Sequence, residues 1–344
     1  MKKLLMLLAA VSLAAVASPA SAQFDQIFDE RGRPHQGAVT KMTPTTITLQ
    51  EGGREVNYDV NTIKSLKFGD EPGELTSVRD FVRQGNMNSA RDELRKIDVA
   101  SIARDVVKQD VAYFSAFVDG QLALQGDGDK AGAKDKMFAF IRANPGTYHL
   151  FEGAELLGDL AMALNAPDEA ARFYSALTRA ESADIKLKAD VLVARALLAQ
   201  QNFSGALEKF EAVAAAPGDS PAMNRQKQFA QIGRAVCLAE TGQPDAGIAA
   251  IDDLISKTDP RDSELFGRAY NAKGRCLVKA NKKEDALLSF LHTDLMFNNV
   301  PEVHAESLYF LSQLWADVQQ AERSVRARSM LTDRYGGTAW AKRQ

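Results

Sequence analysis

The sequence is poor in the residues that most often carry catalysis or bind metals. Among its 344 residues there are two cysteines and four histidines. The histidines (His35, His149, His292 and His304) show no metal-ligand spacing and have no cysteine beside them, whereas zinc requires three or four such ligands. Neither a glycine-rich phosphate loop nor a Gly-x-Ser-x-Gly elbow occurs. We therefore expect no catalytic residues, no metal site and no cofactor.

The chain also lacks an excess of charge of either sign. It carries 42 Lys and Arg against 45 Asp and Glu, a formal net charge of −3. Broad binding to nucleic acid or to an anionic membrane requires a basic surface, so the composition argues against both classes of partner. The acidic pair Asp252-Asp253 fits a solvated helix face. Asp127 and Asp129 suggest a calcium loop, but the acidic ligand expected at its end is replaced by Phe138.

Long hydrophobic runs are missing except at the start of the chain. Lys2 and Lys3 precede the apolar stretch Leu4–Val16, and Ala20-Ser21-Ala22 is a small-residue cleavage pattern. We expect residues 1–22 to be a signal peptide cleaved after Ala22, and the mature protein to be periplasmic or secreted. No later run reaches about 18 apolar residues, so we expect no integral membrane segment after cleavage.

An exported protein is able to hold disulfides, and this one has a single pair of cysteines to consider. Cys237 and Cys276 are 39 residues apart, at the same position of neighbouring helices in the repeat described below. Packed helix axes lie about 8–10 Å apart, whereas a disulfide needs Cα atoms within about 7 Å. The spacing favours two buried free thiols, with a disulfide as the alternative.

Residues 23–70 have the pattern of a small all-β domain. Ala38–Met42, Thr46–Gln50 and Val56–Val60 read as short strands, and the turn Glu51–Arg54 supplies glycines for a hairpin. Ile63, Leu66 and Phe68 close the segment. Because four or five short strands build little core, we expect either a small β-barrel or a curled antiparallel sheet that leans on the helices after it. Proline and glycine in Gly69–Gly73 mark the joint.

From residue 75 onward the sequence is helical and periodic. A small residue recurs at intervals of 36 to 43 residues: Ala90, Ala133, Ala170, Ala206, Gly247, Ala286 and Ser324. A large residue follows four positions later in six copies: Leu94, Met137, Tyr174, Phe210, Ile251 and Phe290. The seventh copy has Arg328 there. A fixed period of this length indicates an array of helical hairpins.

The individual copies resemble the tetratricopeptide repeat (TPR). Leu156-Leu157-Gly158 followed by Ala170 and Phe173-Tyr174 matches one such repeat, and Gly274, Ala286 and Phe290 match another. The resemblance covers about residues 75–344 and implies a mainly α fold, an α-solenoid of about seven TPR-like hairpins. Some copies depart from the pattern, because Val78, Ala194 and Ala235 replace glycine and the spacing exceeds the usual 34 residues. The β segment loosely resembles Sm-like or SH3-like barrels.

The resemblance implies a ligand groove on the concave face, lined by the first helix of each pair. The matching positions are Lys188, Val191, Arg195, Arg268, Asn271 and Arg275. Arginine offers a planar fork for carboxylates. An earlier repeat carries Glu152, Glu155 and Asp159 instead, so we expect a groove with separate acidic and basic halves, the basic half meeting an acidic-tailed partner.

These features favour an exported, non-enzymatic scaffold or adaptor that binds proteins or peptides through its groove. The alternative is a structural or self-associating component of cell-envelope assembly. A third hypothesis is an enzyme with a site between sheet and helices, which a deep cleft with clustered ionisable groups of shifted pKa would favour. The sequence fixes neither the partner nor the oligomeric state.

Overall fold

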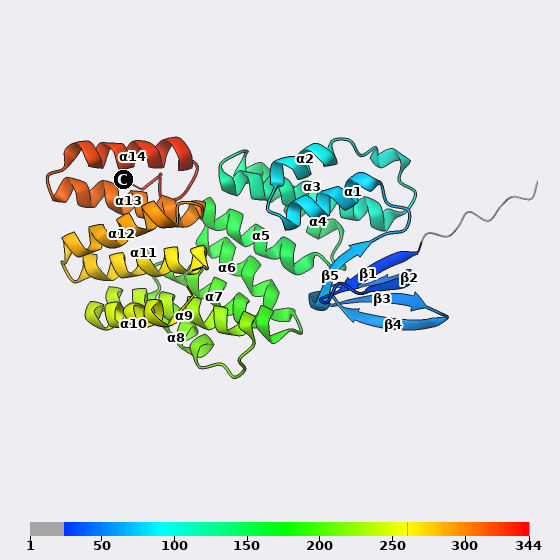
Figure 1. Cartoon of the computed structure of the whole chain (residues 1–344), viewed down its shortest axis with the longest axis horizontal. Helices are drawn as coiled ribbons and strands as arrows, with labels where there is room; N and C mark the ends of the chain where they lie inside the picture. Colours follow the sequence, from blue (N-terminus) through cyan, green and yellow to red (C-terminus); the bar gives the residue numbers. More distant parts are fainter. Residues whose placement is uncertain (1–23, 260, 344) are drawn as a thin grey trace, which may run out of the picture.

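The computed structural model describes residues 24–259 and 261–343, and it consists of a small sheet followed by an array of helical hairpins (Figure 1). The strands are β1 (Asp25–Asp29), β2 (Pro34–Met42), β3 (Thr46–Glu51), β4 (Arg54–Asp59) and β5 (Ile63–Lys67). They pair antiparallel in the order β4-β3-β2-β1-β5.

The sheet is curled on the helices but does not close into a barrel, because its end strands β4 and β5 do not pair. Of the two expected forms, the antiparallel sheet is therefore the one observed. Its apolar side chains Ile27, Leu49 and Leu66 join Leu75 and Val78 of the first helix in one buried cluster. The sheet thus buries its apolar face against helices rather than inside a barrel of its own, as expected for so small a unit.

Fourteen helices in the described part of the chain form seven successive hairpins. The first helices of the pairs are α1 (Gly73–Arg83), α3 (Asp105–Gln125), α5 (Leu150–Ala163), α7 (Ala183–Ala199), α9 (Pro221–Glu240), α11 (Ser263–Lys279) and α13 (Pro301–Asp317). The second helices are α2 (Met87–Leu94), α4 (Lys130–Ala143), α6 (Pro167–Ser175), α8 (Phe203–Ala214), α10 (Pro244–Lys257), α12 (Lys283–Met296) and α14 (Ala321–Tyr335). The array curls so far that the Arg334 carbonyl oxygen lies near Gly126, in the turn after α3.

The predicted repeat is confirmed, because all seven small residues lie on the second helices of their hairpins. Six of them are buried, and Ser324 is half-buried. A Cβ atom added at Gly158 would lie 2.2 Å from the ring of Tyr174, and one at Gly274 would lie 2.6 Å from that of Phe290. The aromatic ring of the second helix therefore packs directly on the backbone of the first, which brings the two helices close together.

The seven hairpin turns share one backbone conformation. Each contains a residue with positive φ: Gly85, Gly126, Asn165, Gln201, Gly242, Asn281 and Gln319. In each turn the amide of the following residue donates to a carbonyl five positions earlier, as from Asn202 to Leu197 and from Gln320 to Trp315. This is the hydrogen bond of the Schellman motif, which satisfies carbonyls at the end of the first helix.

Ion pairs fix the sheet to the array at what we call the junction. Arg104, which precedes α3, donates to both carboxylate oxygens of Asp25 at 2.7 and 3.0 Å, and Asp25 also accepts from the amides of Val39 and Gly69. Arg79 of α1 lies 2.7 Å from Glu71 in the joint and 2.6 Å from Asp110 of α3.

The expectations for the cysteines, the signal peptide and membrane-spanning helices compare with the structure as follows. Cys237 of α9 and Cys276 of α11 are buried free thiols, and burial raises the pKa of each to about 12. The expected signal peptide lies outside the described residues. No helix of residues 24–259 and 261–343 combines the length and apolar character needed to cross a membrane.

Candidate ligand-binding groove

A cavity of about 480 Å³ opens on the concave side of the array. Its walls come mainly from the first helices α3, α5, α7, α9 and α11, together with the start of α13. The segment after α14 reaches it as well, through Thr338, Trp340 and Arg343. We call this cavity the groove, and its volume is in the range of small ligand pockets.

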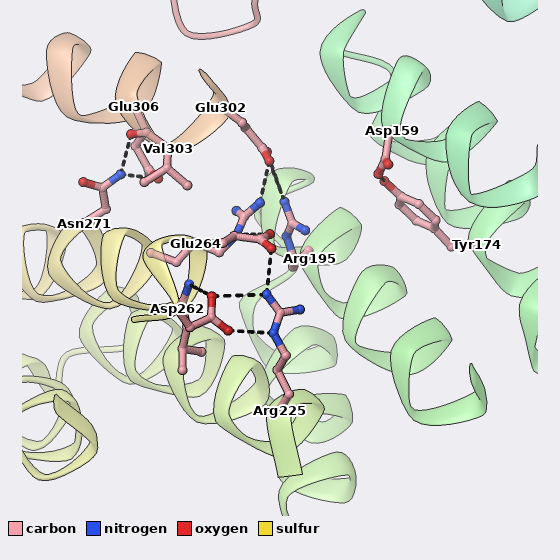
Figure 2. A network of polar contacts seen from close by, with 12 residues as sticks. Asp159, Tyr174, Arg195, Arg225, Asp262, Glu264, Asn271, Glu302, Val303 and Glu306 are labelled. Atoms are coloured by element: carbon pink, nitrogen blue, oxygen red, sulfur yellow. Dashed lines mark hydrogen bonds and ion pairs between the residues drawn. The ribbon is translucent and has the colours of Figure 1, made fainter. Parts of the chain in front are cut away.

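Glu302 at the start of α13 connects three helices across the groove (Figure 2). Its carboxylate accepts from Arg195 of α7 at 3.0 and 3.1 Å and from Arg268 of α11 at 2.7 Å. Burial would raise the pKa of Glu302, but Arg268 and Arg195 outweigh it and lower this pKa to about 2. Glu302 nevertheless keeps half of its side-chain surface exposed.

A third arginine of the groove, Arg225, is also paired with carboxylates. Arg225 of α9 lies 2.7 Å from Asp262 and 3.0 Å from Glu264, and its guanidinium lies 4.6 Å from the centre of the Phe229 ring. Glu264 in turn accepts from Arg268 at 3.1 Å. The arginines and glutamates therefore form one alternating chain along the wall (Figure 2).

The opposite wall holds a carboxyl group, Asp159, that lacks a cationic partner among residues 24–259 and 261–343 and has a raised pKa. Asp159 of α5 accepts a 2.7 Å hydrogen bond from the Tyr174 hydroxyl (Figure 2) and forms no ion pair with a cation of the described residues. Its neighbour Glu155 is already paired with Lys188 at 2.6 Å. Burial, reinforced by the charge of Glu155, raises the pKa of Asp159 to about 7.

Of the six predicted groove residues, Lys188, Val191, Arg195 and Arg268 line the groove. Asn271 is 1% exposed, and its Nδ2 donates to the Val303 carbonyl at 2.8 Å and to Glu306 at 3.1 Å. Arg275 lies outside the cavity and is paired with Glu240 and Glu306. The structure thus brings four of the six together, and it uses Asn271 to dock α13 on α11.

The expected separation of charge into two halves differs from what is observed. Glu264 and Glu302 stand among the arginines, so the basic wall is neutralised from within. Sequence reasoning missed these acids and Arg225. A signal was present, because Arg225, Glu264 and Glu302 each precede the small residue of their own repeat by 22 positions.

A second cleft, of about 580 Å³, lies between the sheet and the helices. At its inner end the His149 ring stacks on Tyr113 with centroids 3.5 Å apart. The two ring nitrogens lie 3.1 Å from Asp110 and 3.3 Å from Glu152. Burial would lower the pKa of His149, but these two carboxylates raise it.

This cluster bears on the hypothesis of an enzyme with a site between sheet and helices. The cleft does contain ionisable groups of shifted pKa. However, both ring nitrogens of His149 are already engaged by carboxylates, so neither is free to act on a substrate, and Asp110 is itself occupied by Arg79 and Tyr148. The arrangement is that of a structural network. Within the part of the chain that the structure describes, no group of three or more His, Cys, Asp and Glu side chains is placed to hold a metal ion.

Several solved structures share this fold. A tetratricopeptide repeat protein from Parabacteroides merdae is 16% identical over 76% of this chain and 92% of its own, with a TM-score of 0.54. A Rap protein complexed with competence and sporulation factor is 12% identical over 78% and 76% of the two chains, with a TM-score of 0.51. The apo form of the quorum sensor NprR from B. thuringiensis is 11% identical over 76% and 86%, with a TM-score of 0.52.

These similarities establish the TPR-like fold and indicate no enzyme family. The sequence matches no protein-family profile and no curated protein.

Proposed function

We propose that this protein is an exported, non-catalytic scaffold that binds a segment of another polypeptide in the groove. The observation that carries the proposal is the pair Arg195 and Arg268, which converge on one carboxylate inside a cavity lined by successive first helices. The similar Rap protein is described in complex with a factor, which supports a binding role for this array. Export is proposed from the pattern of residues 1–22 alone.

The ligand chemistry follows from the two arginines. A carboxylate of the partner, at its chain end or on an acidic side chain, would take the place of Glu302 and accept charge-assisted hydrogen bonds from both guanidinium groups. Glu302 is half-exposed, so it is able to turn into solvent at small cost. It therefore acts as an internal stand-in for the ligand carboxylate.

Affinity capture from the native envelope fraction, read by mass spectrometry, tests the proposal. We expect the double variant Arg195→Gln/Arg268→Gln to lose a partner that the parent protein retains. Arg275→Gln is the matched control, because Arg275 lies in the same array but outside the groove. Glu302→Gln should bind the same partner more tightly. Equal capture by parent and double variant would contradict the proposal.

A second candidate function, self-association in envelope assembly, is favoured by one surface. Leu288, Leu295 and Met296 of α12 are 64%, 71% and 65% exposed, and large side chains of this kind in contact with water often mark an interface. Light scattering of the purified protein tests it. Self-association predicts an oligomer that Leu288→Glu/Leu295→Glu converts to a monomer, whereas the groove proposal predicts a monomer in both cases.

A further inference from the structure

We propose that the cleft between the sheet and the helices is a second binding site, which takes an extended acidic and apolar strand of a partner protein by pairing it with β5. This site adjoins the groove, with which it shares Glu155 and Lys188, and goes beyond the function proposed above. Three observations support it, concerning the edge of the sheet, the wall that faces this edge and the charges along it.

The first observation is that β5 presents a free edge to the cleft. β5 is the last strand of the sheet and pairs with β1. Four consecutive residues, Ile63 to Leu66, line the cleft. The pairing of β5 with β1 shifts register between Phe28 and Asp29, so side chains alternate regularly only from Ser65 onward. On its other side β5 has no partner strand among the described residues, and the backbone groups there are open to another strand.

The second observation is the wall opposite this edge, which is rich in aromatic and apolar side chains. Tyr113, Phe114 and Phe117 of α3 contribute to it, together with Phe151 of α5 and Tyr148 before that helix. Alternate side chains of an added strand would point into this wall, on the face that Leu66 shares. Pairing through the backbone and pockets for alternate side chains are the two components of recognition by strand addition.

The third observation is the charge along the edge. Lys64 lines the cleft, and Lys67 follows at the end of β5, outside the cleft lining. Both are exposed, and neither forms an ion pair with a carboxylate of the described residues. Most other charges of the cleft are matched internally, as Lys188 is by Glu155 and Glu152 is by His149. Acidic residues opposite two lysines stabilise a strand pair, so we infer acidic side chains on the partner strand.

Lysines on an edge strand also have a simpler role, since they discourage unwanted pairing. The two roles predict opposite effects. If the lysines only block pairing, replacing them with glutamine will strengthen the binding of any strand. If they recognise an acidic strand, the same replacement will weaken its binding.

The test uses the purified protein and a six-residue peptide in which glutamate alternates with phenylalanine and valine. Hydrogen exchange should show new protection of the amides of residues 63–67 when the peptide is added. Lys64→Glu/Lys67→Glu should weaken binding about tenfold, because it reverses the charge of the edge that meets the glutamates of the peptide. Lys41→Glu, on the exposed face of β2 away from the cleft, is the matched control and should bind as the parent does.

A second peptide, methylated on alternate backbone nitrogens, keeps the side chains but cannot pair with β5, and we expect it not to bind. The proposal is overturned if the unmodified peptide gives no protection of β5 at millimolar concentration. It is also overturned if the methylated peptide binds equally well, or if replacement of both lysines by glutamine tightens binding. Arg195→Gln/Arg268→Gln should leave this binding unchanged, which separates the cleft from the groove.

Discussion

The junction and the groove both depend on arginine–carboxylate pairs, but the two sets of pairs lie in different surroundings. At the junction, Arg79 is 9% exposed and its partner Asp110 is 1% exposed. In the groove, Arg268 is 15% exposed and its partner Glu302 is 50% exposed. Removal of one partner leaves a buried charge at the junction, whereas in the groove it leaves a charge that water can reach.

This difference in burial separates ion pairs that hold two elements together from ion pairs that a ligand can replace. The two Arg79 pairs of the junction join α1 to Glu71 in the joint and to Asp110 of α3, and these carboxylates are too buried for water to replace a lost cation. The groove pairs connect α7, α11 and α13 through Glu302, which can leave its arginines without being stranded. A site that must accept a ligand carboxylate requires the second arrangement, and a site that must hold two elements together requires the first.

The same substitution made in both regions should give the largest contrast. We expect Arg79→Met to lower the free energy of unfolding by about 3–5 kcal/mol, because it leaves Glu71 and Asp110 buried without their cation. Arg268→Met should lower it by about 1 kcal/mol or less. Urea unfolding followed by circular dichroism measures both. Equal losses of unfolding free energy in the two variants would contradict this difference between the junction and the groove.

A smaller effect is expected in α5, which contributes Glu152 to the cleft and Asp159 to the groove. Gly158→Ala places a methyl group 2.2 Å from the Tyr174 ring, so we expect a loss of about 1–3 kcal/mol through overpacking. Gly146→Ala is the control, because its methyl group would meet nothing within 4 Å. Similar denaturant midpoints for the two variants would contradict the close packing of α5 on α6.

The pH dependence of stability should distinguish the carboxyl groups of the two regions. The pKa of Asp159 is raised to about 7 in the folded protein, so between about pH 4 and 7 the folded state holds a proton that the unfolded chain releases, and stability falls as pH rises. The pKa of Asp110 is instead lowered to about 2, since Arg79 and His149 outweigh its burial. Asp110 therefore contributes stability that is lost as pH falls below about 4.

Asp159→Asn is the variant that isolates this effect. We expect it to match the parent at pH 4 and to be more stable by about 1–2 kcal/mol at pH 8, since the amide carries no charge to desolvate and still accepts from Tyr174. Thermal unfolding at the two pH values measures the difference. A variant that is destabilised equally at both would show that Asp159 is ionised in the fold.

The repeat was predictable from sequence because its signal is steric and local. Ala206 and Phe210 occupy fixed places on one helix, and any bulk at the first would separate the pair. The groove was predictable only in part. The repeat predicts which helix face lines the groove. Whether a residue on this face remains exposed to the cavity depends on how the next hairpin packs. Thus α13 covers Asn271, while Arg195 remains in the cavity.

Other features depend on contacts between segments far apart in sequence. The partnership of Arg195 with Glu302 joins residues 107 positions apart and follows from the curl of the whole array. The sheet is open because β4 and β5 do not pair, and strand patterns alone do not encode which strands pair. The second cleft has the same origin, because it exists only where sheet and helices meet.

The smallest expected effect lies in the turns, which contribute to neither charge network. Gln201 has a φ of 62°, a conformation that costs a residue other than glycine about 1 kcal/mol. Gln201→Gly should therefore raise the free energy of unfolding by about 0.5–1 kcal/mol, since part of the gain is offset by the greater freedom of glycine in the unfolded chain. The neighbouring Gln200 has a φ of −74°, so Gln200→Gly should lower stability by a similar amount. Because the turn joins α7 to α8 without touching Arg79 or Glu302, hydrogen exchange should detect no selective opening of the junction or the groove in either variant. Selective opening of the groove in Gln200→Gly would mean that the groove depends on the rigidity of single turns more than on its ion pairs.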